Sequence, residues 1–295
     1  MRNFIQQSVI IKSLIPVLSI LLFASCENVI QVKLDKGTPE ITIDAFINDM
    51  RVEQKVRLTY TDDYFSQKNN EPVKGATVSL KNLTTNEVFN FTDNSNGDYV
   101  FNITTVDTLA RIGSDYELTV NHQGNIYTST TKLNRTTQID SIKCEFKEAG
   151  LGGKEGYKVS FLAFDIPGGE PDFYWIKSFR NGKFFNKGLE INVAFDAAYS
   201  AGADGLFFIQ PIAEGVTPQG EVFKKYDDVR IELHSISHAT YDFLIQVQKQ
   251  TTNSGLFATT PENVKSNITA ASGNTTKVVG WFSMSAVGFK SKIVE

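Results

Sequence analysis

The sequence predicts an all-β protein with two β-sandwich-like antiparallel domains and one short helix near residues 238–251. Three observations support this fold class. Short runs rich in β-branched and aromatic residues alternate apolar and polar side chains, as half-buried strands do. Turn residues such as Asn96-Gly97 separate the runs at roughly ten-residue spacing, which is typical of antiparallel sandwiches. Outside the first 25 residues, the apolar period of a helix is clear in a single segment.

Residues 1–25 are predicted to be a lipoprotein signal peptide. Arg2 and Lys12 precede an apolar run that ends at Ser25, which is the order of a secretory signal. The run is shorter than the roughly 20 apolar residues of a membrane span. Cys26 follows directly, where lipoprotein processing requires a cysteine. We therefore expect cleavage between Ser25 and Cys26 and a lipid bilayer partner reached through the acylated Cys26, with ordinary secretion as the alternative.

Charge and cysteine content narrow the possible functions. Without residues 1–25 the chain has 27 basic and 33 acidic residues, and a protein that binds a phosphate backbone needs a basic excess. We therefore expect no nucleic-acid partner. Once Cys26 carries lipid, Cys144 has no cysteine partner in the chain. Because Ile142, Cys144 and Phe146 alternate onto one strand face, we expect Cys144 to be a buried apolar side chain rather than a reactive thiol.

Residues 26–39 are predicted to form a lipidated tether with a short strand, and residues 40–135 a transthyretin/Ig-like β-sandwich. Alternation predicts its strands at 41–47, 55–60, 75–80, 88–91, 99–101, 116–120 and 126–130. The order of these pieces resembles the transthyretin-like modules called carboxypeptidase regulatory-like domains. That resemblance implies a non-catalytic module.

Residues 136–295 are predicted to form a second β-rich domain that contains the helix. Its expected strands are at 139–146, 157–164, 173–179, 206–209, 229–233 and 278–286. Tyr241, Leu244, Ile245 and Gln248 fall at the i, i+3, i+4 and i+7 positions of a helix, and Ser237 is placed to cap its start.

Four short motifs and the cysteine together carry a family resemblance. Cys26 is followed by Pro-Val-Lys-Gly-Ala-Thr-Val at 72–78, Gly-Asp-Tyr at 97–99, Leu-His-Ser-Ile-Ser at 233–237 and Gly-Trp-Phe-Ser at 280–283. With these motifs the mature chain resembles the Bacteroidetes lipoprotein family known as domain of unknown function 4249 (DUF4249). The resemblance implies an outer-membrane accessory lipoprotein of TonB-dependent transporters, and it brings no established activity or site residue.

No catalytic, metal or cofactor site is predicted. His234 and His238 are four residues apart, but one ends a strand and the other begins the helix, so a shared metal is not expected. The oxygen-rich run 93–98 lacks the spacing of a calcium loop and is better explained as a hairpin turn. No nucleophile motif occurs in a usable context.

These features favour a non-enzymatic binding or accessory subunit at the outer membrane, beside a TonB-dependent transporter. A surface hydrolase whose site is assembled in space is one alternative, because catalytic sets are recognised by geometry rather than by order in the chain. A structural or adhesive surface protein is the other. The ligand, a small molecule or a peptide, is not identified by the sequence.

Aromatic residues of the second domain are the predicted binding surface. Adjacent side chains on a strand point to opposite faces, so Phe184 and Phe185 cannot both enter one core, and neither can Phe207 and Phe208. Trp175 lies in the same aromatic set. We expect these five residues to include exposed or partner-covered rings.

Two tripeptides resemble the short Asp-Ser/Thr-apolar sequon of Bacteroidetes O-glycosylation. They are Asp107-Thr108-Leu109 and Asp140-Ser141-Ile142. Thr108 and Ser141 are therefore predicted glycosylation sites on surface segments.

Overall fold

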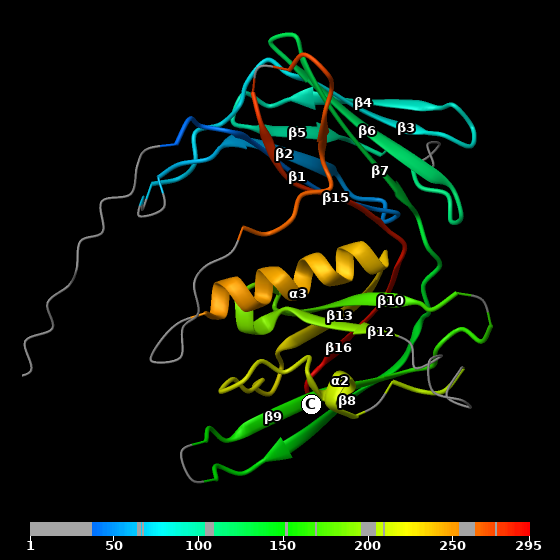
Figure 1. Ribbon diagram of the computed structural model, residues 1–295. Helices are drawn as coiled ribbons and strands as arrows, with labels where there is room; N and C mark the ends of the chain where they lie inside the picture. The colour runs from blue at the N-terminus through cyan, green and yellow to red at the C-terminus, as the bar shows by residue number, and fades with distance from the viewer. Residues whose placement is uncertain are drawn as a thin grey trace, which may run out of the picture. The chain divides into compact units, whose positions relative to one another are not determined.

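The structure is a computed structural model, shown in Figure 1. It describes residues 37–63, 66, 68–103, 109–150, 153–168, 170–195, 205–208, 210–253, 263–274 and 276–295. The predicted signal peptide, Cys26, nearly all of the predicted tether and Thr108 lie outside these residues. Backbone contacts divide the chain into the units Met1–Thr38 and Pro39–Glu295, and every element below belongs to the second unit. None of the helices in the described part of the chain has the length and apolar composition needed to cross a bilayer.

Nine strands form the largest sheet, and it curls into a nearly closed, barrel-like shape. In chain order they are β1 (Ile41–Asn48), β2 (Gln54–Tyr60), β3 (Thr77–Asn82), β4 (Val88–Asp93), β5 (Asp98–Phe101), β6 (Asp115–His122), β7 (Asn125–Lys132), β14 (Thr269–Ala270) and β15 (Val278–Ser285). Their spatial order is β14-β7-β6-β3-β4-β5-β2-β1-β15. The strands predicted between residues 41 and 130 are therefore present, in one sheet rather than two.

The pairing of β1 with β15 departs from the antiparallel expectation. The two strands run parallel from Ile41 opposite Val278 to Asn48 opposite Ser285. Parallel neighbours need a long crossover, and here the crossover contains all of the elements between them in the chain. The predicted strand at 278–286 is real, but it completes the first sheet instead of closing a second sandwich.

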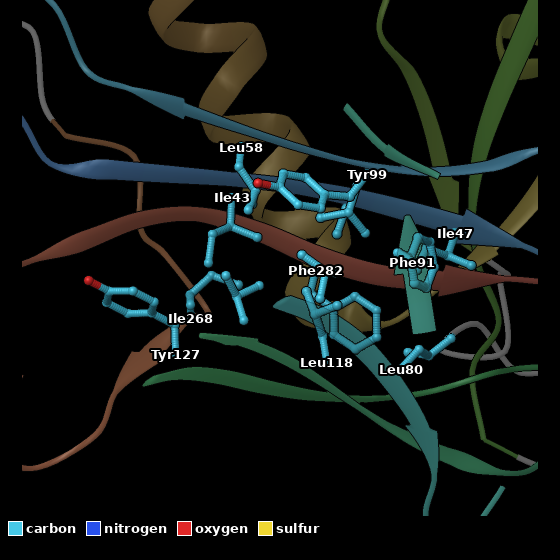
Figure 2. Packing of buried hydrophobic residues seen from close by; sticks show 14 of the residues in the cluster. Ile43, Ile47, Leu58, Leu80, Phe91, Tyr99, Leu118, Tyr127, Ile268 and Phe282 are labelled. Atoms are coloured by element: carbon cyan, nitrogen blue, oxygen red, sulfur yellow. The ribbon is translucent and has the colours of Figure 1, made fainter. Parts of the chain in front are cut away.

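Side chains from all around this sheet fill one interior. Alternate residues of β1 are buried, among them Ile43 and Ile47, and Tyr99, Leu118 and Phe282 join them from other strands. Figure 2 shows these side chains converging between the strands. The hydrophobic burial of this core is what holds the curled sheet together.

The remaining strands form two smaller sheets. The five-stranded sheet contains β10 (Phe173–Arg180), β11 (Lys183–Phe184), β12 (Asn192–Phe195), β13 (Asp228–Ile236) and β16 (Val287–Ile293), in the order β11-β10-β13-β16 with β12 also paired to β10. The two-stranded sheet contains β8 (Ile139–Lys147) and β9 (Gly156–Ala163). A second hydrophobic core lies between them and includes Phe161, Tyr174, Ile176 and Leu233.

The helices are fewer than the strands, as predicted. The expected helix is α3 (His238–Thr252), and Ser237 caps it, since the Ser237 hydroxyl oxygen accepts the Thr240 N–H at 3.1 Å. A short helix, α2 (Gln210–Glu214), and a 3-10 turn, η1 (Gly188–Glu190), were not predicted, because each is too short to show a helical period.

Across the described residues the fold class is therefore mainly β with two helices, and the expectation of two antiparallel sandwiches was wrong in its detail. The large sheet is mixed. Of the strands after residue 136, β14 and β15 join it, and the others form two separate small sheets. The predicted boundaries at 25, 39 and 135 stay predictions. Strand pairing adds that the sheet built from residues 41–132 also takes in β14 and β15.

Candidate functional site

A pocket with apolar walls, which we call the aromatic pocket, is the candidate functional site. It has a volume of about 380 Å³ and lies where the outer side of β1 and β15 meets β10, β11, η1 and α3. Figure 1 shows α3 between the strands of the two larger sheets. The aromatic lining residues are Phe46, Trp175, Phe184, Phe185, Phe243 and Trp281. The volume lies in the range of small-molecule sites.

Strand alternation directs part of β1 into this pocket. Ile43 and Ala45 are buried in the barrel core. Because successive side chains on a strand point to opposite faces, Asp44 and Phe46 project from the other side of the sheet, and both line the pocket. One strand therefore supplies the barrel core with one face and the pocket with the other.

The rings of the pocket pack against one another in a connected set. Phe46 meets Trp175 edge-on with ring centroids 5.3 Å apart, and it lies 6.4 Å from Phe243. Phe243 stacks on Trp281 at 4.3 Å, and Trp175 lies 6.2 Å from Phe184. Offset and edge-on contacts of this kind fix ring orientation, so the walls are held in place before any ligand arrives.

The helix α3 positions one wall through a buried hydrogen bond. The indole Nε1–H of Trp281 donates to Thr240 Oγ1 at 3.1 Å. Thr240 is fully buried in the first turn of α3 and contacts Ser283 Oγ on β15 at 3.3 Å. The helix is thus tied to β15, and its next turns place Phe243 and Val247 on the pocket.

A lysine ammonium lies beside the aromatic wall. Lys177 Nζ is 4.0 Å from the ring centroid of Trp175 and 5.7 Å from that of Phe184, which are cation–π distances. Burial lowers the pKa of Lys177 to about 8, although Glu232 and Asp44 oppose the shift. The surroundings therefore compensate this positive charge only in part.

The neighbouring strand β13 carries a carboxylate, that of Glu232, which already accepts hydrogen bonds from two other side chains. Glu232 lies directly opposite Lys177 in the β10–β13 pairing. Its Oε1 accepts a hydrogen bond from Arg230 Nε at 2.7 Å, and its Oε2 accepts one from His234 Nε2 at 2.8 Å. Burial opposes ionisation of Glu232, but these two bonds outweigh it and lower its pKa. Burial lowers the pKa of His234 to about 4, so the imidazole is neutral near pH 7.

Asp44 brings a second carboxylate to the pocket from β1. It reaches solvent, yet protein atoms surround much of it because it stands in a concave site. The resulting desolvation raises its pKa, against the opposing effect of Lys55, Lys177 and Arg57.

The five predicted surface residues fall into two groups. Trp175, Phe184 and Phe185 line the aromatic pocket. Phe184 faces Trp175, whereas Phe185 packs edge-on against Phe223 at 5.9 Å, so the adjacent rings do point in different directions.

Phe207 and Phe208 lie elsewhere, in a groove over β8 and β9. Phe207 is 54 % exposed, while Phe208 turns inward to Phe161 and Tyr174 at 5.8 and 5.1 Å. The groove is larger, about 670 Å³, and charged side chains from both strands line it. Its lysines are largely engaged, since Lys158 Nζ donates to the Glu221 carbonyl at 2.7 Å.

Ser141 lines this same groove and is exposed at a β-bulge, where β8 slips by one residue against β9. Its glycosylation stays a prediction, and so do the glycosylation of Thr108 and the acylation of Cys26. Cys144 is half-buried on β8, and burial raises the pKa of its thiol.

The histidines are placed in separate environments. His234 is buried beside Glu232, whereas His238 stacks on the Phe173 ring at 4.7 Å at the start of α3. His122 Nε2 lies 3.1 Å from the Tyr60 hydroxyl. In the part of the chain that the structure describes, no three His, Cys, Asp or Glu side chains come together as a metal site would require.

The oxygen-rich run at 93–98 forms the turn between β4 and β5. Asp93 accepts the N–H groups of Gly75 and Ser95, and Asp98 accepts a hydrogen bond from Arg57 at 2.8 Å. The carboxylates of this run therefore stabilise the turn and bind the neighbouring strand β2.

Sequence reasoning did not find Asp44, Phe243 or Trp281 as pocket residues, and it did not find Lys177 as a charge against the Trp175 ring. Two signals were available. Phe46 occupies an outward position of an alternating strand, which is unusual for a side chain facing water. Lys177 follows Trp175 by two residues, so both project from the same face of β10.

Comparisons with known proteins give a family and distant structural likenesses. The chain is 12% identical to chicken CNTN1 FN1-FN3 domains, with a TM-score of 0.22 over 69% of this chain and 64% of that one. It is 10% identical to a bacterial ice-binding adhesin involved in host cell surface retention, with a TM-score of 0.20 over 89% and 66%. The chain thus spans under two thirds of each. No curated protein matches it. The model of the family described as Domain of unknown function (DUF4249) matches residues 27–291, and the chain belongs to that family.

Proposed function

We infer that the protein is a lipid-anchored, non-enzymatic binding subunit of the outer membrane, which acts beside a TonB-dependent transporter and takes a small apolar ligand into the aromatic pocket. The pocket is the observation that carries the binding role. Its walls are apolar, its rings are fixed by mutual packing, and three of the five residues predicted from the sequence line it.

The contacts of the histidines support a role without catalysis. Nucleophilic hydrolysis needs a hydroxyl or thiol bonded to a base. Among the described residues, His122 bonds Tyr60, His234 bonds Glu232 and His238 lies 3.7 Å from an Asp242 carboxylate oxygen. None of the three is hydrogen-bonded to a serine, threonine or cysteine side chain there. The pocket also favours ligand binding over a purely adhesive role, because an adhesive surface has no need of a preformed cavity.

The anchoring and the partner rest on the sequence and the family. Cys26 directly after a secretory signal supports acylation, and the family resemblance supports the transporter. Affinity capture of the tagged protein from native membranes tests both, with an unrelated outer-membrane lipoprotein as the control bait. We expect an acylated Cys26 terminus by mass spectrometry and a TonB-dependent transporter in the captured material alone. An unmodified terminus in a soluble fraction, or equal transporter in both captures, would contradict the proposal.

The binding role has a built-in reporter. The chain contains 2 tryptophans, and both of them, Trp175 and Trp281, line the pocket. A ligand that enters should therefore change most of the intrinsic tryptophan emission. The lipidated full chain in phospholipid nanodiscs, titrated with 1-octanol against empty nanodiscs, gives a first measurement.

A further inference from the structure

Lys177 carries a positive charge that has no direct ion-pair partner among the residues that the structure describes. Within the described residues, its ammonium has ring contacts with Trp175 and Phe184, and no carboxylate oxygen comes within 4.0 Å. Lys177 is not among the residues that line the aromatic pocket, but its ammonium is in a largely desolvated position against the rings of Trp175 and Phe184, which do line it. We propose that the pocket binds an apolar molecule with one anionic group, such as a carboxylate, and that Lys177 pairs with that group. This inference rests on the proposed ligand-binding function.

The obvious internal partner cannot fill the role. Glu232 is opposite Lys177 on the next strand, but one of its oxygens accepts from Arg230 and the other from His234. A carboxylate held in this way acts on Lys177 only over a longer distance. An ammonium has three N–H donors, and a ring face compensates a buried charge less than a hydrogen-bonded anion does.

Asp44 does not replace the missing anion. It lines the pocket from β1 and influences Lys177 electrostatically, but its oxygens stay beyond ion-pair distance and its side chain reaches solvent. Glu190, the other acidic lining residue, accepts the Lys187 N–H at 2.7 Å to close the η1 turn. Both carboxylates disfavour a ligand with more than one negative charge, which supports a single anionic group.

The walls define the rest of the ligand. Phe46, Phe243, Trp281 and Val247 surround the space with apolar surface, so the body of the ligand has to be apolar to gain from leaving water. A charged head beside Lys177 and an alkyl or ring body against these side chains describe an amphiphilic acid. A neutral molecule of the same shape would gain from the apolar contact but not from a charge pair with Lys177.

Three probes of equal chain length separate charge from apolar binding. Octanoate, 1-octanol and octylammonium are titrated into the lipidated full chain in nanodiscs, with tryptophan emission as the readout. We expect octanoate to bind at least about tenfold more tightly than 1-octanol, because a charge-assisted pair adds to the apolar contact, and octylammonium to bind most weakly. Equal affinity for octanoate and 1-octanol, or a preference for octylammonium, would overturn the proposal.

Two substitutions then assign the preference to one side chain. Lys177→Met keeps an unbranched side chain of similar length and removes the charge, so the affinities for octanoate and 1-octanol should differ by less than about twofold. Lys249→Met changes an exposed lysine of α3 and should leave the preference intact. A Lys177→Met protein that still prefers octanoate contradicts the assignment. If that variant does not fold, the wild-type comparison still decides. If none of the three probes changes the emission, the proposed ligand-binding function fails as well.

Discussion

The side-chain amide of Asn267 pairs with the backbone of Phe282 in both directions. Asn267 Oδ1 accepts the Phe282 N–H at 2.9 Å, and Asn267 Nδ2 donates to the Phe282 carbonyl at 2.7 Å. The backbone carbonyl of Asn267 accepts a hydrogen bond from Ser129 Oγ on β7 at 2.8 Å. Asn267 thus bridges β7 and β15 at the place where the nine-stranded sheet nearly closes.

Replacing this amide should weaken the bridge that Asn267 makes between β7 and β15. Asn267→Asp keeps the shape but presents a carboxylate oxygen to the Phe282 carbonyl, so we expect the free energy of unfolding to fall by about 1–3 kcal/mol. Urea denaturation measures it. Asn274, whose amide pairs with the exposed backbone of Ile126 at 3.1 and 2.7 Å, is the matched control. We expect a smaller loss of unfolding free energy for Asn274→Asp. An equal loss would argue against a special role for the bridge between β7 and β15.

Gly280 should be essential for the parallel pairing of β1 with β15. Its φ is +124°, and a Cβ there would lie 1.9 Å from the Ile43 carbonyl oxygen. Gly280→Ala forces the two backbones apart, so we expect a loss of several kcal/mol or a failure to fold. Gly273→Ala has a similar positive φ of +89° but open space around it, and it should cost about 1 kcal/mol. Circular dichroism melts of both variants distinguish steric exclusion from backbone preference.

Thr240 should contribute to stability through the indole of Trp281. Thr240→Val keeps the volume and leaves the buried Trp281 N–H without its acceptor, which should cost about 1–3 kcal/mol. Thr251→Val, on the exposed part of the same helix, should stay within about 0.5 kcal/mol of the wild type. Urea denaturation of the two variants makes the comparison. Equal effects would mean that the helix, rather than the contact with Trp281, responds.

His234 should make the protein less stable in mild acid. Its pKa is about 4 in the fold and near 6.5 when unfolded, so the unfolded chain takes up a proton first as the pH falls. The contribution is fully present above pH 6.5 and is lost as the pH falls toward 4, by on the order of 3 kcal/mol in all. Unfolding free energies measured between pH 4 and 7 show this slope.

A paired substitution assigns that slope. His234→Gln retains an N–H donor for Glu232 and should flatten most of the slope. His122→Gln removes a second histidine whose pKa burial lowers, and it should remove a smaller part. A slope that is unchanged in His234→Gln would show that another group titrates in this range.

Local patterns predicted much of the fold. Alternation located most strands, and period and capping located α3 with its N-cap at Ser237, because these signals are encoded within one element. Pairing between distant strands is not encoded in that way. The parallel contact of β1 with β15 depends on the crossover between them, and the sequence at 278–286 reads the same in either sheet.

The candidate site was predictable only in part. Phe184 and Phe185 stood out because neighbouring rings cannot share a face, and Trp175 stood out with them. The other pocket residues come from elements far apart in the chain, such as Phe46 on β1 and Phe243 on α3. Nothing in the sequence shows that Glu232 accepts hydrogen bonds from Arg230 and His234. Because of these bonds, Lys177 has no direct carboxylate partner within the described part of the chain.

The most direct test of whether ligands bind in the aromatic pocket is to narrow the pocket by substitution and to measure ligand binding. Val247 lines the pocket, whereas Val52 is 50 % exposed outside it. Tryptophan emission is titrated with octanoate for the wild type, Val247→Phe and Val52→Phe. We expect saturable changes for the wild type and Val52→Phe, and a much weaker response for Val247→Phe, because the added ring narrows the pocket. The same titration curve for all three proteins would contradict the claim that ligands enter this pocket.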